Sequence, residues 1–254
     1  IIVITGASSG LGKQMTRLIL KKGGNVFAIS RSDEGLENLK KEFLEYKDKL
    51  YTFCADVSKK EECHNAMLDV YERFKKIDVL INNAGVGLAD KIEKIKEDQL
   101  KIVFDVNFFG SFYMMQEAIP ILIKQNQGII VNICSLGVKR PVPNTGGYTA
   151  SKAALSLISS VARIELSKSK IKVINVFPGS IETDFRKNAL GEGYLQNQKR
   201  LSRISPELAA RRILKGIERM KKEIYTSVGD YAFAKLSTLF PNVSDWLIKK
   251  AFDK

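Results

Sequence analysis

Three of the eight tyrosines in this chain of 254 residues stand four positions before a lysine. A phenol and an ammonium group at this spacing lie one turn apart on the same face of a helix. The cation can then stabilise the phenolate and lower the pKa of the phenol from about 10, so that the tyrosine serves as a general acid and base near neutral pH. The three pairs are Tyr71 with Lys75, Tyr148 with Lys152, and Tyr231 with Lys235.

A serine thirteen positions upstream would supply such a tyrosine with a partner that hydrogen-bonds a substrate oxygen. Tyr148 has Ser135 at this distance and Tyr71 has Ser58, whereas Tyr231 has a glutamate there. The spacing alone therefore excludes one pair and leaves two.

The two serines differ in the elements that precede and follow them. Ser135 directly follows the apolar run 129–134, which is typical of a buried strand. Ligands of parallel sheets bind beyond the carboxyl ends of the strands. We expect Ser58 instead to be the N-cap of a helix that carries Tyr71 on its surface. Tyr148 is therefore the predicted catalytic tyrosine.

Short apolar runs alternate with longer amphipathic segments along most of the chain. The predicted strands are 1–5, 25–30, 51–55, 77–82, 129–134, 172–177 and 224–226. The predicted helices are 11–22, 34–46, 60–75, 99–125, 148–167 and 206–221. Strands that are apolar throughout indicate a parallel sheet covered on both faces. We predict an α/β fold, a Rossmann-type doubly wound parallel sheet of about seven strands with helices on both faces, in a single domain over 1–254.

Two segments depart from this alternation. The segment 178–204 is long for a connection and contains glycines, which predicts a substrate lid over 179–204. An amphipathic helical extension is expected over 230–254, divided at Pro241. We expect this extension to pack on the domain or across a dimer interface, with peripheral contact to a membrane as the alternative.

A glycine-rich turn, Thr5-Gly6-Ala7-Ser8-Ser9-Gly10-Leu11-Gly12, joins the first predicted strand to the first helix. Glycines let the backbone turn tightly and approach a pyrophosphate, which binds free N–H groups and the positive end of the helix dipole. The candidate phosphate contacts are Gly6, Ser8, Ser9, Gly10, Leu11 and Gly12.

This turn and several later motifs resemble the short-chain dehydrogenase/reductase family. TGASSGLG matches the family pattern TGxxxGxG, and the resemblance continues in family order to about residue 226. The further matches are Asp56-Val57, Asn82-Asn83-Ala84-Gly85, Asn107, Ser135, Tyr148-x-x-x-Lys152 and Pro178-Gly179.

The resemblance implies that these motifs bind a nicotinamide dinucleotide. The residues expected on the adenosine side are Asp56, Val57, Asn83, Ala84 and Gly85. The residues expected around the nicotinamide are Pro178, Gly179, Ile181 and Thr183. The resemblance also implies a homodimer or homotetramer formed through the helices at 99–125 and 148–167.

The end of the second strand indicates which dinucleotide binds. NAD-preferring relatives usually carry an acidic residue there, whereas this chain has Ser30-Arg31-Ser32. The forked cation of Arg31 suits a 2′-phosphate, with Ser8, Ser9 and Ser30 as nearby hydroxyl donors. We predict that NADP(H) is preferred over NAD(H); the alternative is that Arg31 is a solvated charge before a helix.

The resemblance assigns the catalytic roles. Tyr148 would exchange a proton with the substrate oxygen, and Ser135 would hydrogen-bond that oxygen. Lys152 would lower the pKa of Tyr148 and hold the ribose hydroxyls, while Asn107 matches an asparagine thought to hold a water that links the lysine to solvent. Cys134 replaces a serine common in the family, and we expect it to be a small buried packing residue.

These predictions combine into an oxidoreductase that transfers hydride between NADP(H) and a carbonyl or secondary alcohol. The predicted substrate pocket, built from 136–144, 86–89 and the loop after Thr183, is mostly apolar and favours a lipid-like, steroid-like or acyl substrate. The alternatives are a 3-oxoacyl-carrier-protein-type reductase and a catalytically silent dinucleotide-binding regulator.

Composition excludes several other classes of protein. The net charge of +13 suggests an acidic partner or surface, but no nucleic-acid-binding motif is present, so we expect no nucleic acid partner. One histidine and three cysteines without a CxxC pair predict no metal site. No apolar run is long enough to span a bilayer, which favours a cytoplasmic or cytosol-facing protein. An upstream anchor stays open because the chain starts at its first strand without Met.

Overall fold

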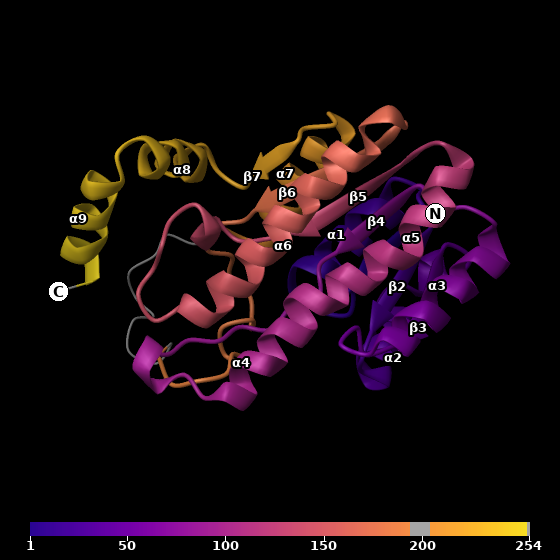
Figure 1. Ribbon diagram of the computed structural model, residues 1–254. Helices are drawn as coiled ribbons and strands as arrows, with labels where there is room; N and C mark the ends of the chain where they lie inside the picture. The colour runs from indigo at the N-terminus through magenta and orange to yellow at the C-terminus, as the bar shows by residue number, and fades with distance from the viewer. Residues whose placement is uncertain (194–203, 253–254) are drawn as a thin grey trace.

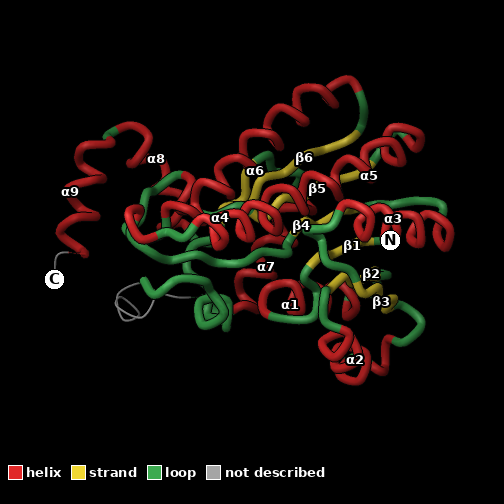
Figure 2. Tube along the Cα trace, turned by 60° about the horizontal axis from the view of Figure 1, so that its bottom comes forward, coloured by secondary structure: helices red, strands yellow, loops and turns green. Residues whose placement is uncertain are grey.

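The computed structural model describes residues 1–193 and 204–252, and in it seven parallel strands form one sheet between two layers of helices (Figure 2). The strand order is β3-β2-β1-β4-β5-β6-β7, which confirms the predicted doubly wound Rossmann-type sheet. The strands are β1 (Ile2–Thr5), β2 (Val26–Ser30), β3 (Leu50–Cys54), β4 (Val79–Asn82), β5 (Gly128–Ile133), β6 (Ile171–Phe177) and β7 (Glu223–Tyr225).

The helices bury their apolar faces on the two sides of the sheet. The helices are α1 (Gly10–Lys21), α2 (Asp33–Glu42), α3 (Lys60–Phe74), α4 (Glu97–Phe104), α5 (Ser111–Gln125), α6 (Gly146–Glu165), α7 (Pro206–Glu218), α8 (Val228–Leu239) and α9 (Pro241–Phe252). Met15, Leu36 and Ile213 bring α1, α2 and α7 into the core of one face, whereas Met67 and Met114 bring α3 and α5 into the core of the other. Each face of the sheet therefore has its own apolar layer. Figure 2 shows the helices on both sides of the strands.

Strand order reverses between β1 and β4, which are hydrogen-bonded neighbours. The chain turns away in opposite directions after these two strands, so a crevice opens beyond their carboxyl ends. The loops that follow β1, β4, β5 and β6 all begin at this edge of the sheet. The predicted site residues lie in these loops or next to them.

The long helix predicted over 99–125 is not a uniform α-helix. The structure has α4 and α5 joined by a π-helical turn over Asp105–Gly110. Within this turn Asn107 and Gly110 are buried, and a Cβ atom at Gly110 would lie 2.8 Å from Cγ2 of Val57. The extra residue in the turn thus aims Asn107 at the interior next to the crevice.

The predicted N-cap role of Ser58 is wrong. The structure places Lys59 at the N-cap of α3, and Ser58 lies in the preceding turn. The backbone N–H of Ser58 donates to Oδ1 of Asp56 over 2.9 Å. Asp56 therefore forms a turn through its side chain that ends at Ser58, one residue before the N-cap Lys59.

The C-terminal extension consists of α8 and α9, divided at Pro241 as predicted. Figure 1 shows the two helices at the end of the molecule beyond β7, on the side away from the N-terminus. Across the described residues, no helix combines the length and the hydropathy that crossing a membrane requires.

The described part of the predicted lid is fixed to the loop after β4. Leu190 donates its N–H to the carbonyl of Gly87 over 2.9 Å, and Gly193 donates to Ala89 over 2.6 Å. Residues 194–203 lie outside the described residues, so the lid over 179–204 stays a prediction.

Candidate active site

The glycine turn after β1 has the backbone conformation that its residues predict. Gly6 and Gly10 have φ angles of 64° and 50°, in the left-handed region that glycine adopts without strain. A Cβ atom at Gly12 would lie 2.2 Å from the carbonyl oxygen of Gly6, so no larger residue fits where α1 crosses the turn. The first turn of α1 contains no acidic residue, and its N–H groups lack intrahelical acceptors, which suits an anionic ligand.

Asn83 holds this turn from the neighbouring strand. Its Nδ2 donates to the carbonyl oxygens of Thr5 and Gly6 over 2.9 and 3.1 Å. The hydroxyl oxygen of Thr5 accepts from the backbone N–H groups of Asn83 and Ala84, each over 3.0 Å. The side chain of Asn83 therefore stabilises the shape of the glycine turn.

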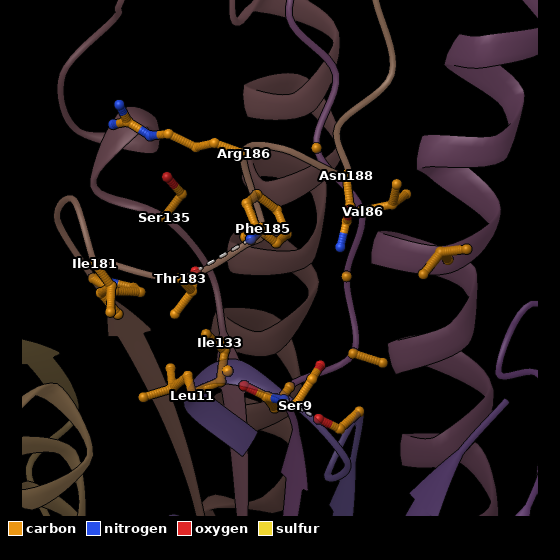
Figure 3. Close-up of a pocket in the computed structure, with 18 of the residues that line it drawn as sticks. Ser9, Leu11, Val86, Ile133, Ser135, Ile181, Thr183, Phe185, Arg186 and Asn188 are labelled. Atoms are coloured by element: carbon orange, nitrogen blue, oxygen red, sulfur yellow. Dashed lines mark hydrogen bonds between the residues drawn. The ribbon is translucent and has the colours of Figure 1, made fainter. Parts of the chain in front are cut away.

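A cavity of about 840 Å³ extends along the carboxyl edge of the sheet and unites most of the predicted site residues. The predicted residues that line it are Gly6, Ser8, Ser9, Gly10, Leu11, Arg31, Asp56, Val57, Asn83, Ala84, Gly85, Ser135, Tyr148, Lys152, Pro178, Gly179, Ile181 and Thr183. Gly12 and Asn107 do not line it, because both are buried behind its wall. Figure 3 shows side chains from the loops after β1, β4, β5 and β6 around this space.

Sequence reasoning did not select two threonines that also line the cavity. Thr145 precedes α6 and Thr149 lies in its first turn, and their hydroxyl groups are 3.2 Å apart. Both flank Tyr148 in the sequence, which is the only signal that could have found them.

Tyr148 and Lys152 lie one turn apart in the first half of α6. The ring of Tyr148 packs edge-on against Phe185, with 5.7 Å between the ring centroids. Lys152 is 3% exposed, and its Nζ donates to the backbone carbonyl of Ile133 over 2.9 Å. Burial lowers the pKa of Lys152 to about 8. The ammonium lies beside Gly85, since a Cβ atom there would be 3.3 Å from Nζ.

Ser135 follows β5 and caps the short 3-10 turn Leu136–Val138. Its Oγ accepts the backbone N–H of Gly137 over 3.1 Å and donates to no acceptor among residues 1–193 and 204–252. The hydroxyl proton therefore remains for an oxygen inside the cavity. Cys134 is buried, as predicted, and burial raises the pKa of its thiol to about 12.

Asn107 is fully hydrogen-bonded through its side chain. Its Nδ2 donates to the carbonyl of Val86 over 2.9 Å and to Oγ of Ser151 over 3.0 Å, while Oδ1 accepts the N–H of Val86 over 2.8 Å. A Cβ atom at Gly85 would lie 3.1 Å from Oδ1, on the same side as Lys152. The amide therefore fixes the cavity wall next to the lysine.

The other two tyrosine and lysine pairs use their cations differently. Lys75 Nζ lies over the ring of Tyr71, 5.6 Å from its centroid, and Lys235 lies over Tyr231 at the same distance. None of these four residues lines the cavity. Lys152 therefore differs from Lys75 and Lys235, because its ammonium donates to a buried backbone carbonyl group, whereas theirs lie over tyrosine rings.

Comparison with known proteins identifies the family to which the chain belongs. The family model for the short chain dehydrogenase matches residues 1–192. The chain belongs to the short-chain dehydrogenase family. It is thus an oxidoreductase of a family that uses nicotinamide dinucleotides.

Relatives of this short-chain dehydrogenase cover nearly all of the chain. Dehydrogenase/reductase SDR family member 7B of Xenopus tropicalis is 32% identical over 235 residues, which cover 88% of this chain and 76% of that protein. A short-chain dehydrogenase from Streptomyces avermitilis has a TM-score of 0.84 and 26% identity, covering 100% of this chain and 98% of its own. A Burkholderia cenocepacia short chain dehydrogenase, solved in complex with NADP, has a TM-score of 0.82 and 25% identity, covering 97% and 96% of the two chains.

The end of β2 in this short-chain dehydrogenase carries a cation and hydroxyl groups beside the glycine turn. Arg31 is exposed at the edge of the cavity and forms no ion pair within the described parts of the chain. Oγ of Ser8 and Oγ of Ser30 are 2.8 Å apart beside it. A guanidinium and two hydroxyl groups thus stand where β2 ends, and the glycine turn with its unobstructed N–H groups lies next to them.

Proposed function

We propose that this protein is an NADP(H)-preferring carbonyl reductase or secondary alcohol dehydrogenase that acts on a hydrophobic substrate. The observation that carries the proposal is one cavity that connects the glycine turn to Ser135, Tyr148 and Lys152. A dinucleotide that spans this cavity brings its reactive end to the three polar side chains.

Bound NADPH would supply the hydride. Ser135 donates its free hydroxyl proton to the carbonyl oxygen of the substrate and so orients it. Tyr148 transfers its phenolic proton to the same oxygen as that oxygen gains charge. Lys152 stabilises the phenolate, and its cation acts strongly because the site is shielded from water. Asn107 keeps the wall at Val86 in place beside the lysine.

The test is NADPH oxidation with a panel of carbonyl compounds, comparing Tyr148→Phe with Tyr71→Phe. Both variants lose one hydroxyl group from a tyrosine that stands four positions before a lysine. We expect Tyr148→Phe to lower kcat by about 10² to 10⁴-fold, as loss of a general acid does. Tyr71→Phe should retain the wild-type rate, because Tyr71 lies outside the cavity and its hydroxyl only accepts from Lys124. Equal rates in both variants would contradict the mechanism.

The preference for NADP(H) is supported by Arg31, Ser8 and Ser30 at the end of β2. Arg31→Asp would place a negative charge against the 2′-phosphate. We expect its kcat/KM for NADPH to fall by at least about 10-fold relative to that for NADH, the ratio that 1.4 kcal/mol produces. The control Arg219→Asp changes an exposed arginine outside the cavity. An unchanged cofactor ratio in Arg31→Asp would refute the preference.

The hydrophobic substrate class is supported by the apolar residues in the part of the cavity that lies around Tyr148. Val86, Leu136, Val142 and Phe185 line it. The panel should therefore contain steroids, long-chain ketones and 3-oxoacyl thioesters. Carrier-bound thioesters test the alternative function, a 3-oxoacyl-carrier-protein-type reductase. A preference for small hydroxylated sugars would contradict this class.

We also propose a homodimer formed through α4, α5 and α6. These helices expose large apolar side chains, which a partner subunit would cover. On these helices they are Ile102, Ile123, Leu157, Val161 and Ile164, and the π-helical turn between α4 and α5 adds Phe109.

A further inference from the structure

Arg140 is a cation in the cavity that the proposed mechanism does not use. It lies five residues after Ser135, in the segment between β5 and α6, and it lines the cavity. Its guanidinium carbon is 4.8 Å from the centroid of the Phe233 ring, which α8 contributes. The aromatic face stabilises the guanidinium by a cation–π contact while the residue borders the cavity.

The side chain of Arg140 donates to no acceptor, and no carboxylate lies within 4 Å of it, in the part of the chain that the structure describes. Burial lowers the pKa of Arg140, and the charge of Asp230 opposes this effect. The carboxylate of Asp230 is engaged elsewhere, because it accepts from Oγ1 of Thr226 over 3.1 Å and lies against Gly179. A guanidinium that is withdrawn from water with five donors and no acceptor is costly unless a ligand supplies one.

A second arginine reaches the same part of the cavity from another loop. Arg186, from the segment after β6, lines the cavity and donates from Nη2 to Oγ of Ser180 over 2.9 Å. Figure 3 shows its side chain extending across the cavity to the side on which Ser135 lies. Two acidic residues nearby in sequence, Glu182 and Asp184, also line the cavity, and Asp184 is paired with Lys187 at 2.7 Å. Neither carboxylate pairs with Arg140 in the described parts of the chain, so the guanidinium beside the apolar residues of the cavity favours a ligand that is both hydrophobic and anionic.

We propose that Arg140 binds an oxyanion of the substrate, so that the preferred substrates are carbonyl compounds with an apolar body and a carboxylate or phosphate group. The planar fork of the guanidinium matches two oxygens of either group, and stacking on Phe233 sets its orientation. This inference rests on the proposed function, since it names the substrate class of the same site.

The experiment compares anionic substrates with matched neutral ones. One arm uses long-chain oxo fatty acids against their methyl esters, and the other uses long-chain oxoalkyl phosphates against the corresponding alcohols. We expect the wild-type kcat/KM to be about 10- to 100-fold higher for the anion, the range of a hydrogen bond to a charged group. The arm with the larger ratio of kcat/KM, anion over neutral compound, shows whether the site prefers a carboxylate or a phosphate.

The variants are Arg140→Met, which keeps the length of the side chain, Arg140→Lys, and the exposed control Arg219→Met. We expect Arg140→Met to bring the ratio of anion to neutral substrate close to one, chiefly through a higher KM for the anion. Arg140→Lys should retain part of the ratio, because a point charge replaces the fork. Arg219→Met should keep the wild-type ratio.

The inference and the proposed function fail in different ways. If the wild type reduces neutral and anionic carbonyls with equal kcat/KM, or if Arg140→Met loses the same factor with both, the inference is wrong while the reductase stands. If no carbonyl is reduced, Kd values of the oxo acid and its ester are compared by equilibrium dialysis. A preference for the acid that Arg140→Met removes supports the anion site without the reductase, and equal Kd values overturn it.

Discussion

Replacing Lys152 with Met should make the protein more stable and inactive at the same time. Lys152 is 3% exposed, and burial lowers its pKa from the ordinary 10.5 to about 8. A shift of this size corresponds to about 3 kcal/mol that the folded state loses by holding the cation out of water. Methionine has a similar length and removes this cost, together with the hydrogen bond from Nζ to Ile133, which contributes about 1 kcal/mol. We therefore expect a gain of about 2 kcal/mol in the free energy of unfolding at pH 7.

The stability difference between Lys152→Met and the wild type should depend on pH. Below pH 8 the lysine is charged in both the folded and the unfolded chain, so the folded wild type bears the full cost. Between pH 8 and 10.5 the folded protein loses the proton while the unfolded chain still holds it, and wild-type stability rises. The advantage of Lys152→Met should therefore shrink across this window and be absent at pH 10.5.

The assay is urea unfolding without dinucleotide from pH 7 to 10.5, with Lys235→Met as the matched control. Lys235 follows a tyrosine at the same spacing but is exposed, so its replacement should change stability little at any pH. Thermal unfolding at pH 7 should show a midpoint about 5 °C higher for Lys152→Met. The reasoning is refuted if Lys152→Met is no more stable than the wild type at pH 7, or if its advantage does not decline as the pH rises.

Three further predictions follow from burial and packing. Gly12→Ala would place a Cβ atom 2.2 Å from the carbonyl oxygen of Gly6. We expect it to weaken NADPH binding by at least about tenfold in a fluorescence titration, and unchanged affinity would contradict the close approach. Only Cys54 of the three cysteines is exposed. One thiol should therefore react with a chromogenic disulfide in the native protein at pH 8 and three after denaturation, because burial raises the pKa of the other two to about 12; three fast native thiols would refute this. Leu157 and Ile164 are 69% and 73% exposed on α6. Changing both to Asp should yield a monomer in sedimentation velocity with unaltered circular dichroism, and a dimer that persists would exclude this face.

The strands could be predicted because their burial leaves a simple pattern in the sequence. All five residues of β2 are buried, and six of the seven in β6, so each strand appears as a mostly apolar run with few polar residues: Ser30 in β2, and Lys172 and Asn175 in β6. The edge at which the strands end then brought the glycine turn, Ser135 and Tyr148 to one cavity. The order of strands and helices, which the sequence does reveal, was enough to choose between Tyr148 and Tyr71, the two tyrosines that local spacing left as candidates.

Features that depend on distant partners could not be predicted. The π-helical turn over Asp105–Gly110 has no local signal, because Asn107 is held by Val86, twenty-one residues away. Arg140 lies in a segment that the sequence assigned to the substrate pocket, but its support on Phe233 comes from α8. Lys59 rather than Ser58 is the N-cap of α3, and Ser58 lies in the preceding turn, where its N–H donates to Asp56. In each case a contact made only in the folded chain decides the local geometry.

The same reasoning explains why a tyrosine stands four positions before a lysine three times, while only Tyr148 is proposed as catalytic. On a solvated helix the lysine lowers its energy by lying over its own tyrosine, as Lys75 and Lys235 do, and the ammonium stays hydrated. Lys152 has no such freedom, because the carboxyl end of β5 gives it a single carbonyl acceptor and removes the water. The burial of Lys152 lowers the stability of the folded protein. The same burial strengthens the electrostatic effect of Lys152 on Tyr148, since the interaction of two charges strengthens as water is excluded. A lysine moved to the surface at the same spacing would keep the motif and lose the chemistry.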